Sequence, residues 1–324
     1  MSTRRPTRRQ QLLAAFGLAG LGLGLGACTE DASDSTRSGV VAEASASEAE
    51  SSGHLGRVHL VIQPQPDELE PEPQLQLSAR FVEFHGVSED FVRARANLPA
   101  PVWEQLVPGQ CVASERLLPT TNLDEGEVER ELSMLDAGDL RVALGGRELV
   151  APLALVPDIL PWLSGVEYNT VDDRLPRLRF TPDGRAPIHI SADGSPGGEV
   201  DGFDVTVAVP VPLELDTPEV DTKGLRVAWR PPGATSDTIV VRLQTFSHAE
   251  DGLSEPVGEE LTCLVIDSGR ADFALSTLAN EGLAVGADHL RVSASRFDLA
   301  KVNAGDFGEV EVLVELRAQR SVGL

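Results

Sequence analysis

Residues 74–84 read QLQLSARFVEF and decide the fold class of this chain. Leu75, Leu77, Ala79 and Phe81 alternate with polar side chains, which gives a hydrophobic period of two residues. A period of two places apolar groups on one face of a β-strand, whereas a helix would need a period near 3.6. The stretch therefore predicts a half-buried strand.

The same alternation recurs along the chain, and Gly, Pro and Asp turn signals separate the segments. Short strands divided by such turns are typical of antiparallel β structure. A short helix is expected within residues 273–283. Strands are expected at residues 57–62, 74–84, 139–144, 177–180, 187–191, 203–209, 224–229, 237–246, 260–267, 290–297 and 310–317.

Composition changes divide the chain into four parts. Residues 29–56 are rich in Ser, Ala and acidic side chains, so they lack the apolar surface needed to fold and predict a disordered tether. The prolines at 210, 212 and 218 suggest a boundary, because proline interrupts a central strand. We expect an all-β protein with two antiparallel β-sandwich modules, at residues 57–216 and 217–324, behind the tether.

The second module contains Trp229 on an expected strand, a proline-rich turn, an alternating strand and then Cys263. This pattern resembles immunoglobulin-like and fibronectin-like sandwiches, although the paired cysteines inside one immunoglobulin domain are absent. With residues 135–140 (LDAGDL), the chain also resembles uncharacterised tandem β-sandwich lipoproteins of bacterial envelopes. That resemblance implies no activity.

The first 28 residues have the three parts of an export signal. Residues 1–11 are basic and polar, residues 12–27 are uncharged and apolar, and small residues precede Cys28. These parts define a secretory signal peptide. The apolar run is too short and too rich in glycine for a stable membrane span.

Residues 25–28 (LGAC) resemble the lipobox of bacterial lipoproteins. The resemblance implies cleavage before Cys28, lipidation of its thiol, and anchoring of the mature chain to a membrane. Acyl chains contribute about 0.8 kcal/mol per buried CH₂, so several chains hold a protein firmly. An ordinary signal peptide with an unmodified cysteine is the alternative.

Residues 7–13 (TRRQQLL) resemble a twin-arginine export motif, with Arg8 and Arg9 as the arginine pair. Gln11 departs from that pattern, so the twin-arginine and general export routes both stay open. Thr29 after the lipidated cysteine favours the outer membrane by the enterobacterial sorting rule. The expected location is the cell envelope, at the outer membrane or at a membrane surface that faces the periplasm.

The charge of the chain limits its partners. A formal net charge of −24 results from 51 acidic and 27 basic residues. Such a chain repels nucleic-acid phosphates, so nucleic acid is not an expected partner. The expected partners are the membrane, through the lipid, and an unidentified protein or other envelope component.

Two cysteines follow Cys28. Cys111 and Cys263 fall in different expected modules, so a disulfide between them would require the modules to pack together. The preferred interpretation of Cys263 is a small buried apolar residue on an alternating strand.

The sequence contains no recognisable catalytic or metal motif. It has no Gly-x-Ser-x-Gly elbow, no phosphate-binding glycine loop and no His-Glu-x-x-His pair. His59 and His189 lie on expected strands and are interpreted as exposed or hydrogen-bonded. Calcium is the least improbable ligand, because carboxylates occur in turns at Asp136 and Asp139, Asp172 and Asp173, and Asp201 and Asp204. Ordinary Asp turn chemistry is the preferred account of these residues.

We therefore expect no catalytic residues, no metal and no cofactor. The leading hypothesis is a lipid-anchored envelope lipoprotein that works as a binding or structural protein rather than an enzyme. The alternatives are an exported hydrolase with a carboxylate-based site and a calcium-dependent adhesion module.

Overall fold

The computed structural model describes residues 52–65, 75–118, 131–144, 146–160, 163–170, 187–232, 237–248 and 254–324. The described chain is mostly β, as predicted. The signal peptide, most of the tether and the strand expected at 177–180 lie outside it. The tether was expected to reach residue 56, but the first strand already begins at Gly53.

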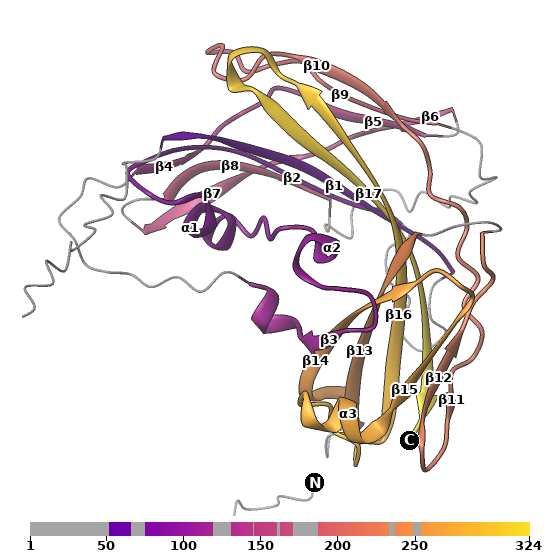
Figure 1. The fold of residues 1–324 in the computed structure, drawn as a ribbon. Helices are drawn as coiled ribbons and strands as arrows, with labels where there is room; N and C mark the ends of the chain where they lie inside the picture. The colour runs from indigo at the N-terminus through magenta and orange to yellow at the C-terminus, as the bar shows by residue number, and fades with distance from the viewer. Residues whose placement is uncertain are drawn as a thin grey trace, which may run out of the picture. The chain divides into compact units, whose positions relative to one another are not determined.

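Ten described strands form one large sheet (Figure 1). Their order across the sheet is β3 (Cys111–Ala113), β14 (Ser254–Ile266), β13 (Thr238–His248), β16 (His289–Asn303), β17 (Glu309–Gly323), β1 (Gly53–Gln65), β2 (Leu75–His85), β4 (Glu131–Met134), β8 (Leu163–Asn169) and β7 (Leu153–Leu160).

The large sheet is mixed, which corrects the prediction of purely antiparallel structure. β1 pairs in parallel with β17, and β4 pairs in parallel with β8. β1 and β17 lie near opposite ends of the described chain. No hairpin turn connects them, and so no hairpin imposes an antiparallel direction.

Two small sheets accompany the large one. The first has four strands in the order β10 (Phe203–Val207), β9 (Ile188–Ala192), β5 (Leu140–Leu144) and β6 (Arg147–Val150). The second has three strands in the order β11 (Glu219–Val220), β12 (Gly224–Ala228) and β15 (Arg270–Ala274).

Each small sheet shares a hydrophobic core with the large one. In the first core, Leu60 and Phe81 of the large sheet join Ile190 of the four-stranded sheet. In the second, Val241 joins Val227 of the three-stranded sheet. The long strand β17 contributes to both cores, and the large sheet takes strands from both sides of the boundary expected at residue 217.

Short helices occupy the connections. The expected helix within 273–283 is confirmed as α3 (Leu275–Asn280). The others are α1 (Glu89–Arg95), α2 (Val102–Gln105) and the 3₁₀ turns η1 (Ser114–Leu117) and η2 (Gly305–Phe307). None of the helices in the described ranges has the length and hydrophobicity that a membrane crossing requires.

The segment from α1 to η1 packs on the large sheet through two further apolar clusters. Val92 of α1 packs with Val82 and Phe84 of β2. Leu106, which ends α2, packs with Val240 and Leu264. Val82 and Val240 alternate with core residues on their strands, so this segment covers the sheet face opposite the two main cores.

Candidate binding site

The alternation of β1 and β17 places ionisable side chains on the face that the α1–η1 segment covers. Val58 and Leu60 point into the first core, so Arg57 and His59 point to the other face. On β17, Val314 and Leu316 point into the core, so Glu315 faces the same way as Arg57 and His59. Parallel pairing of the two strands brings these groups together.

A pocket of about 130 Å³ lies between this sheet face and the covering segment. We call it the Trp103 pocket. Its roof is the stretch from Asn97 to Trp103, and its walls include Phe297 and Leu313. Its floor consists of polar and charged side chains, which are Arg57, His59, Ser78, Arg80, Arg242 and Glu315. A cavity of similar size can hold a benzene-sized group, so the Trp103 pocket can take one small chemical group.

Glu315 is the centre of the polar floor. Its side chain is completely buried and accepts hydrogen bonds from Ser295 Oγ at 2.7 Å, Arg317 Nε at 2.9 Å and Arg242 Nη1 at 3.2 Å. His59 Nε2 lies 3.0 Å from the other carboxylate oxygen. Both oxygens of this carboxylate are therefore held by partners.

These partners keep Glu315 ionised. Burial by itself would raise the pKa of this carboxyl, because a charged group loses hydration in the protein interior. The positive charges of Arg242 and Arg317 and the hydrogen bond with His59 outweigh burial. Together they hold the pKa of Glu315 well below its ordinary value.

Two arginines fasten the roof to the sheet. Arg57 donates from Nη1 to the carbonyl of Pro99 at 2.5 Å and from Nε to Glu311 at 2.9 Å. Arg80 donates to the carbonyl of Asn97 in the roof at 3.4 Å and to that of the preceding Ala96 at 2.9 Å, and it forms an ion pair with Glu167 at 2.6 Å. Because each guanidinium binds a carboxylate and a roof carbonyl together, the roof is held in place over the floor.

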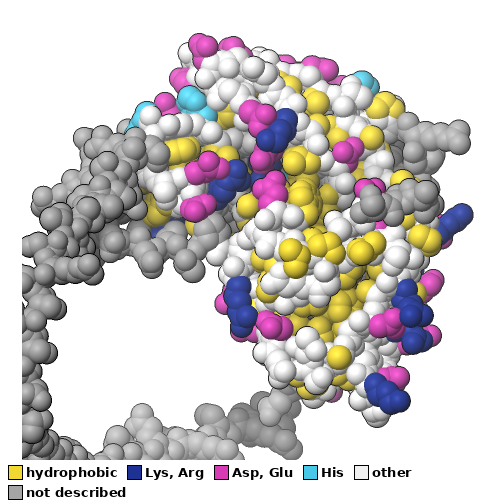
Figure 2. Space-filling model, viewed as in Figure 1, with side chains coloured by type: hydrophobic (Ala, Val, Ile, Leu, Met, Phe, Trp, Pro, Cys, Tyr) yellow, Lys and Arg dark blue, Asp and Glu magenta, His cyan; other side chains and the backbone are white. Residues whose placement is uncertain are grey.

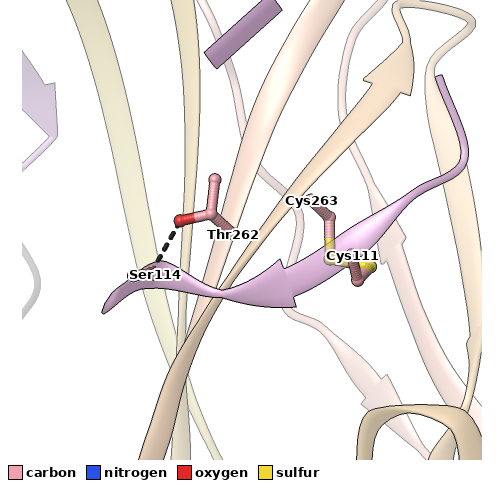
Figure 3. Close-up of a disulfide and its surroundings, with 4 residues drawn as sticks. All are labelled: Cys111, Ser114, Thr262 and Cys263. Atoms are coloured by element: carbon pink, nitrogen blue, oxygen red, sulfur yellow. Dashed lines mark hydrogen bonds between the residues drawn. A yellow bond between two sulfur atoms is a disulfide. The ribbon is translucent and has the colours of Figure 1, made fainter. Parts of the chain in front are cut away.

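The ring of Trp103 packs against Phe297, with 5.1 Å between the ring centroids. Beyond Trp103 the covering segment reaches β3, which pairs with β14 at the edge of the large sheet. Cys111 is joined to Cys263 there by a disulfide, and the Ser114 and Thr262 hydroxyls hydrogen-bond at 2.7 Å (Figure 3). The segment is therefore fixed covalently as well as by packing.

The disulfide changes the interpretation of Cys263. Cys263 is fully buried, as predicted, but it is bonded to Cys111 instead of carrying a free thiol. The two cysteines meet because β3 joins the sheet of the C-terminal segment, across the boundary expected at residue 217. Disulfides are typical of exported proteins and rare in the cytosol.

The chemistry of the Trp103 pocket suits binding. Of the described residues that line it, only Glu315 carries a carboxylate. Glycoside hydrolysis requires two carboxyl groups, one of them with a raised pKa so that it can donate a proton. Glu315 has the opposite property, since its pKa is lowered.

Two of the carboxylates considered for calcium, those of Asp136 and Asp139, have local partners. Asp136 Oδ1 accepts hydrogen bonds from the Gly138 N–H at 2.8 Å and the Tyr168 hydroxyl at 2.7 Å. Asp139 pairs with Arg141 at 2.9 Å. Within the described ranges, no three His, Cys, Asp or Glu side chains are grouped to hold a metal. Asp172 and Asp173 lie outside those ranges.

Many basic groups elsewhere on the described surface pair with acidic ones. Most basic side chains on the face shown in Figure 2 lie against acidic ones. Arg226, for example, lies 2.9 Å from Asp272, and Arg116 lies 3.0 Å from Glu281.

Of the remaining predicted residues, His59 and His189 are hydrogen-bonded, as expected. His189 Nδ1 lies 3.0 Å from the Thr206 hydroxyl. Cys28, Arg8 and Arg9 lie outside the described part of the chain. The sequence interpretation missed the Trp103 pocket, although charged residues at alternate positions on β17 signalled a polar sheet face.

No protein-family model and no curated protein matches the sequence.

Proposed function

We propose that this protein is a lipid-anchored envelope lipoprotein that binds a ligand or partner without catalysing a reaction. The acyl chains on Cys28 would hold it at a membrane surface facing the periplasm or at the outer membrane. The signal-peptide pattern before Cys28 supports export. The Cys111–Cys263 disulfide supports an oxidising compartment.

The Trp103 pocket is the proposed anchor point for the ligand. One observation carries this proposal: an apolar roof is fastened over a floor of ionised groups around Glu315. Such a pocket accepts a small group with an apolar body and a hydrogen-bonding end, such as one side chain of a protein partner. Most binding energy in protein interfaces comes from a few groups buried in such pockets.

The immunoglobulin-like or fibronectin-like nature of residues 217–324 is part of the same proposal. Trp229 is buried in the second core with Val241 and Cys263, and a buried tryptophan on a strand is one feature of such sandwiches that supports the proposal. The sheet face under the α1–η1 segment then serves for binding, as in other proteins that use a rigid β scaffold.

Metabolic labelling with a radioactive fatty acid tests the anchor. Cells that produce the wild type should yield a labelled protein in the membrane fraction, and the Cys28→Ser variant should yield an unlabelled one. An unlabelled wild type would contradict the lipoprotein assignment.

Affinity capture from solubilised envelope tests the pocket. Ala100 lines the Trp103 pocket, so Ala100→Phe should fill it and reduce recovery of a specific partner at least tenfold. The matched control is Ala208→Phe, at an exposed position outside the pocket, which should recover the partner as the wild type does. Equal recovery by both variants would rule out the pocket as the binding site.

A further inference from the structure

The ion pairs around the Trp103 pocket indicate the charge of the group that it takes. Every arginine in its described lining already pairs with a carboxylate. The pairs are Arg57–Glu311, Arg80–Glu167 and Arg242–Glu315. A charged group could gain a counter-charge only by breaking one of these partly or fully buried pairs, which is costly. The pocket therefore favours an uncharged group.

Two hydrogen-bonding atoms of the floor take no part in those pairs. Ser78 of β2 lies directly opposite His59 of β1, so the two side chains are neighbours on the same sheet face. His59 uses Nε2 toward Glu315. Among the described residues, no group hydrogen-bonds to the Ser78 hydroxyl or to His59 Nδ1. Both atoms are therefore available to a ligand.

The position of the hydrogen on His59 indicates the chemistry of the ligand. The ionised Glu315 can only accept, so His59 Nε2, which lies 3.0 Å from its carboxylate, donates. In the neutral imidazole Nδ1 is then an acceptor. The Ser78 hydroxyl can donate. A ligand atom that meets both must donate to His59 and accept from Ser78, and a hydroxyl does both whereas a carbonyl oxygen does only one.

The walls indicate what carries the hydroxyl. The rings of Trp103 and Phe297, both partly exposed, and the side chain of Leu313 give the pocket an apolar part. Its volume of about 130 Å³ suits one six-membered ring. Among protein side chains only tyrosine combines such a ring with a hydroxyl. Indole is larger and its N–H only donates, whereas serine and threonine lack the ring.

We propose that the Trp103 pocket binds the side chain of a tyrosine on the partner protein. Its ring lies against Trp103 and Phe297, and its hydroxyl lies between His59 and Ser78. This inference rests on the proposed function, because it names the group that the same pocket takes. Tyrosine is among the side chains that contribute most to binding in protein interfaces.

Calorimetric titration of the full-length protein in a nonionic detergent tests the assignment, with N-acetyltyrosinamide as the probe. The titration is done at pH 8, where histidine is ordinarily neutral. N-acetylphenylalaninamide lacks only the hydroxyl, and N-acetylphosphotyrosinamide replaces it with a charged group. We expect the tyrosine compound to bind at least tenfold more tightly than either, because a site built for a hydroxyl rejects an analogue without it.

Three results of this titration would each overturn the proposal. The first is no binding of N-acetyltyrosinamide up to its solubility limit. The second is equal binding of the phenylalanine compound. The third is tighter binding of the phosphotyrosine compound, which would show that the arginines of the lining are open to an anion.

Ser78→Ala should weaken binding of the tyrosine compound about tenfold and leave the phenylalanine compound unchanged, because only the hydroxyl contact is lost. Ser191→Ala is the matched control, since Ser191 is also a partly buried strand serine but does not line the pocket. It should keep the preference of the wild type. Weakening of both compounds alike by Ser78→Ala, or an unchanged preference, would overturn the hydroxyl contact.

Affinity capture with Ala100→Phe separates this inference from the proposed function. If Ala100→Phe loses a partner that the wild type recovers, but N-acetyltyrosinamide does not bind, only the tyrosine assignment falls. If N-acetyltyrosinamide binds selectively while capture is unchanged, the tyrosine site stands and the captured partner binds elsewhere.

Discussion

Asp267 and Arg296 form an ion pair that is almost completely buried. Arg296 Nε lies 2.6 Å from Asp267 Oδ2, and the two residues are 5 % exposed or less. The other oxygen of Asp267 accepts a hydrogen bond from Trp229 Nε1 at 2.7 Å. Arg296 also donates to the carbonyls of Pro212 and Arg230. The pair therefore ties the chain on both sides of β12 to the large sheet.

Loss of Arg296 should be strongly destabilising. Arg296→Met keeps much of the side-chain volume but leaves the charge of Asp267 buried without its partner. Breaking a buried ion pair in this way costs about 3 to 5 kcal/mol of the free energy of unfolding. Urea unfolding followed by circular dichroism measures this change.

Arg226→Met is the matched control, because Arg226 pairs with Asp272 at the surface, where both side chains are about half exposed. Its urea midpoint should stay near that of the wild type, since exposed ion pairs contribute little. Equal losses in the two variants would show that burial of the Asp267–Arg296 pair is unimportant.

Glu315 should make the stability depend on acid pH. Its pKa is lower in the folded chain than in the unfolded chain, where glutamate titrates near about 4.3. The ionised group therefore stabilises the fold fully above that pH, and the contribution disappears as the pH falls through the lower folded-state value. Urea midpoints measured from pH 7 down to pH 3 should decrease more steeply for the wild type than for Glu315→Gln.

Glu214→Gln provides the comparison for Glu315→Gln, because Glu214 is exposed and lies 3.7 Å from Arg230. It should follow the pH profile of the wild type. If the urea midpoints of all three proteins fall in parallel as the pH decreases, Glu315 does not control the loss of stability at acid pH.

The strands were largely predictable because each depends on a local alternation. The expected segments at 139–144, 187–191 and 224–229 correspond to β5, β9 and β12. The segments expected at 290–297 and 310–317 are parts of longer strands, β16 and β17. Their extra residues pair with each other, so tertiary pairing sets the strand length.

The pocket could not be predicted in the same way. His59 and Glu315 both lie on predicted strands, but they are 256 residues apart in sequence and meet only through the parallel pairing of β1 with β17. No local pattern encodes that pairing.

Helix α1, which the sequence analysis did not predict, did have a local signal. Ser88 caps this helix, and Glu89 and Asp90 occupy its first turn.

Tyr168 should ionise only when the protein unfolds. Its hydroxyl accepts a hydrogen bond from the Ala137 N–H at 2.8 Å and lies 2.7 Å from Asp136 Oδ1. Burial, with the Asp136 carboxylate beside it, raises the pKa of Tyr168 well above its ordinary value. Tyr168 is the only tyrosine in the chain, so absorbance at alkaline pH reports this one group.

Titration of the native protein should show no phenolate until it unfolds, whereas the protein in concentrated urea should titrate near pH 10. A native transition near pH 10 would contradict the buried hydrogen bonds. Tyr168→Phe should lower the free energy of unfolding by about 1 to 3 kcal/mol, because the Ala137 N–H loses its acceptor.

The disulfide should stabilise the whole sheet as well as the roof of the Trp103 pocket. Cys111 and Cys263 are 152 residues apart, so the cross-link closes a long loop in the unfolded chain. The double variant Cys111→Ser, Cys263→Ser should lose about 2 to 5 kcal/mol of unfolding free energy. Urea unfolding of the two proteins in a Cys28→Ser background, where no other cysteine is present, measures the difference.

Dithiothreitol should lower the urea midpoint of the protein that retains Cys111 and Cys263 and leave the double variant unchanged. Equal midpoints with and without the reductant would mean that the cross-link does not stabilise the fold. Because β3 is a three-residue edge strand that the disulfide ties covalently to β14, the end of the covering segment should open before the sheet unfolds. Hydrogen exchange at residues 106–113 should therefore accelerate in the reduced protein at urea concentrations where β13 and β16 remain protected.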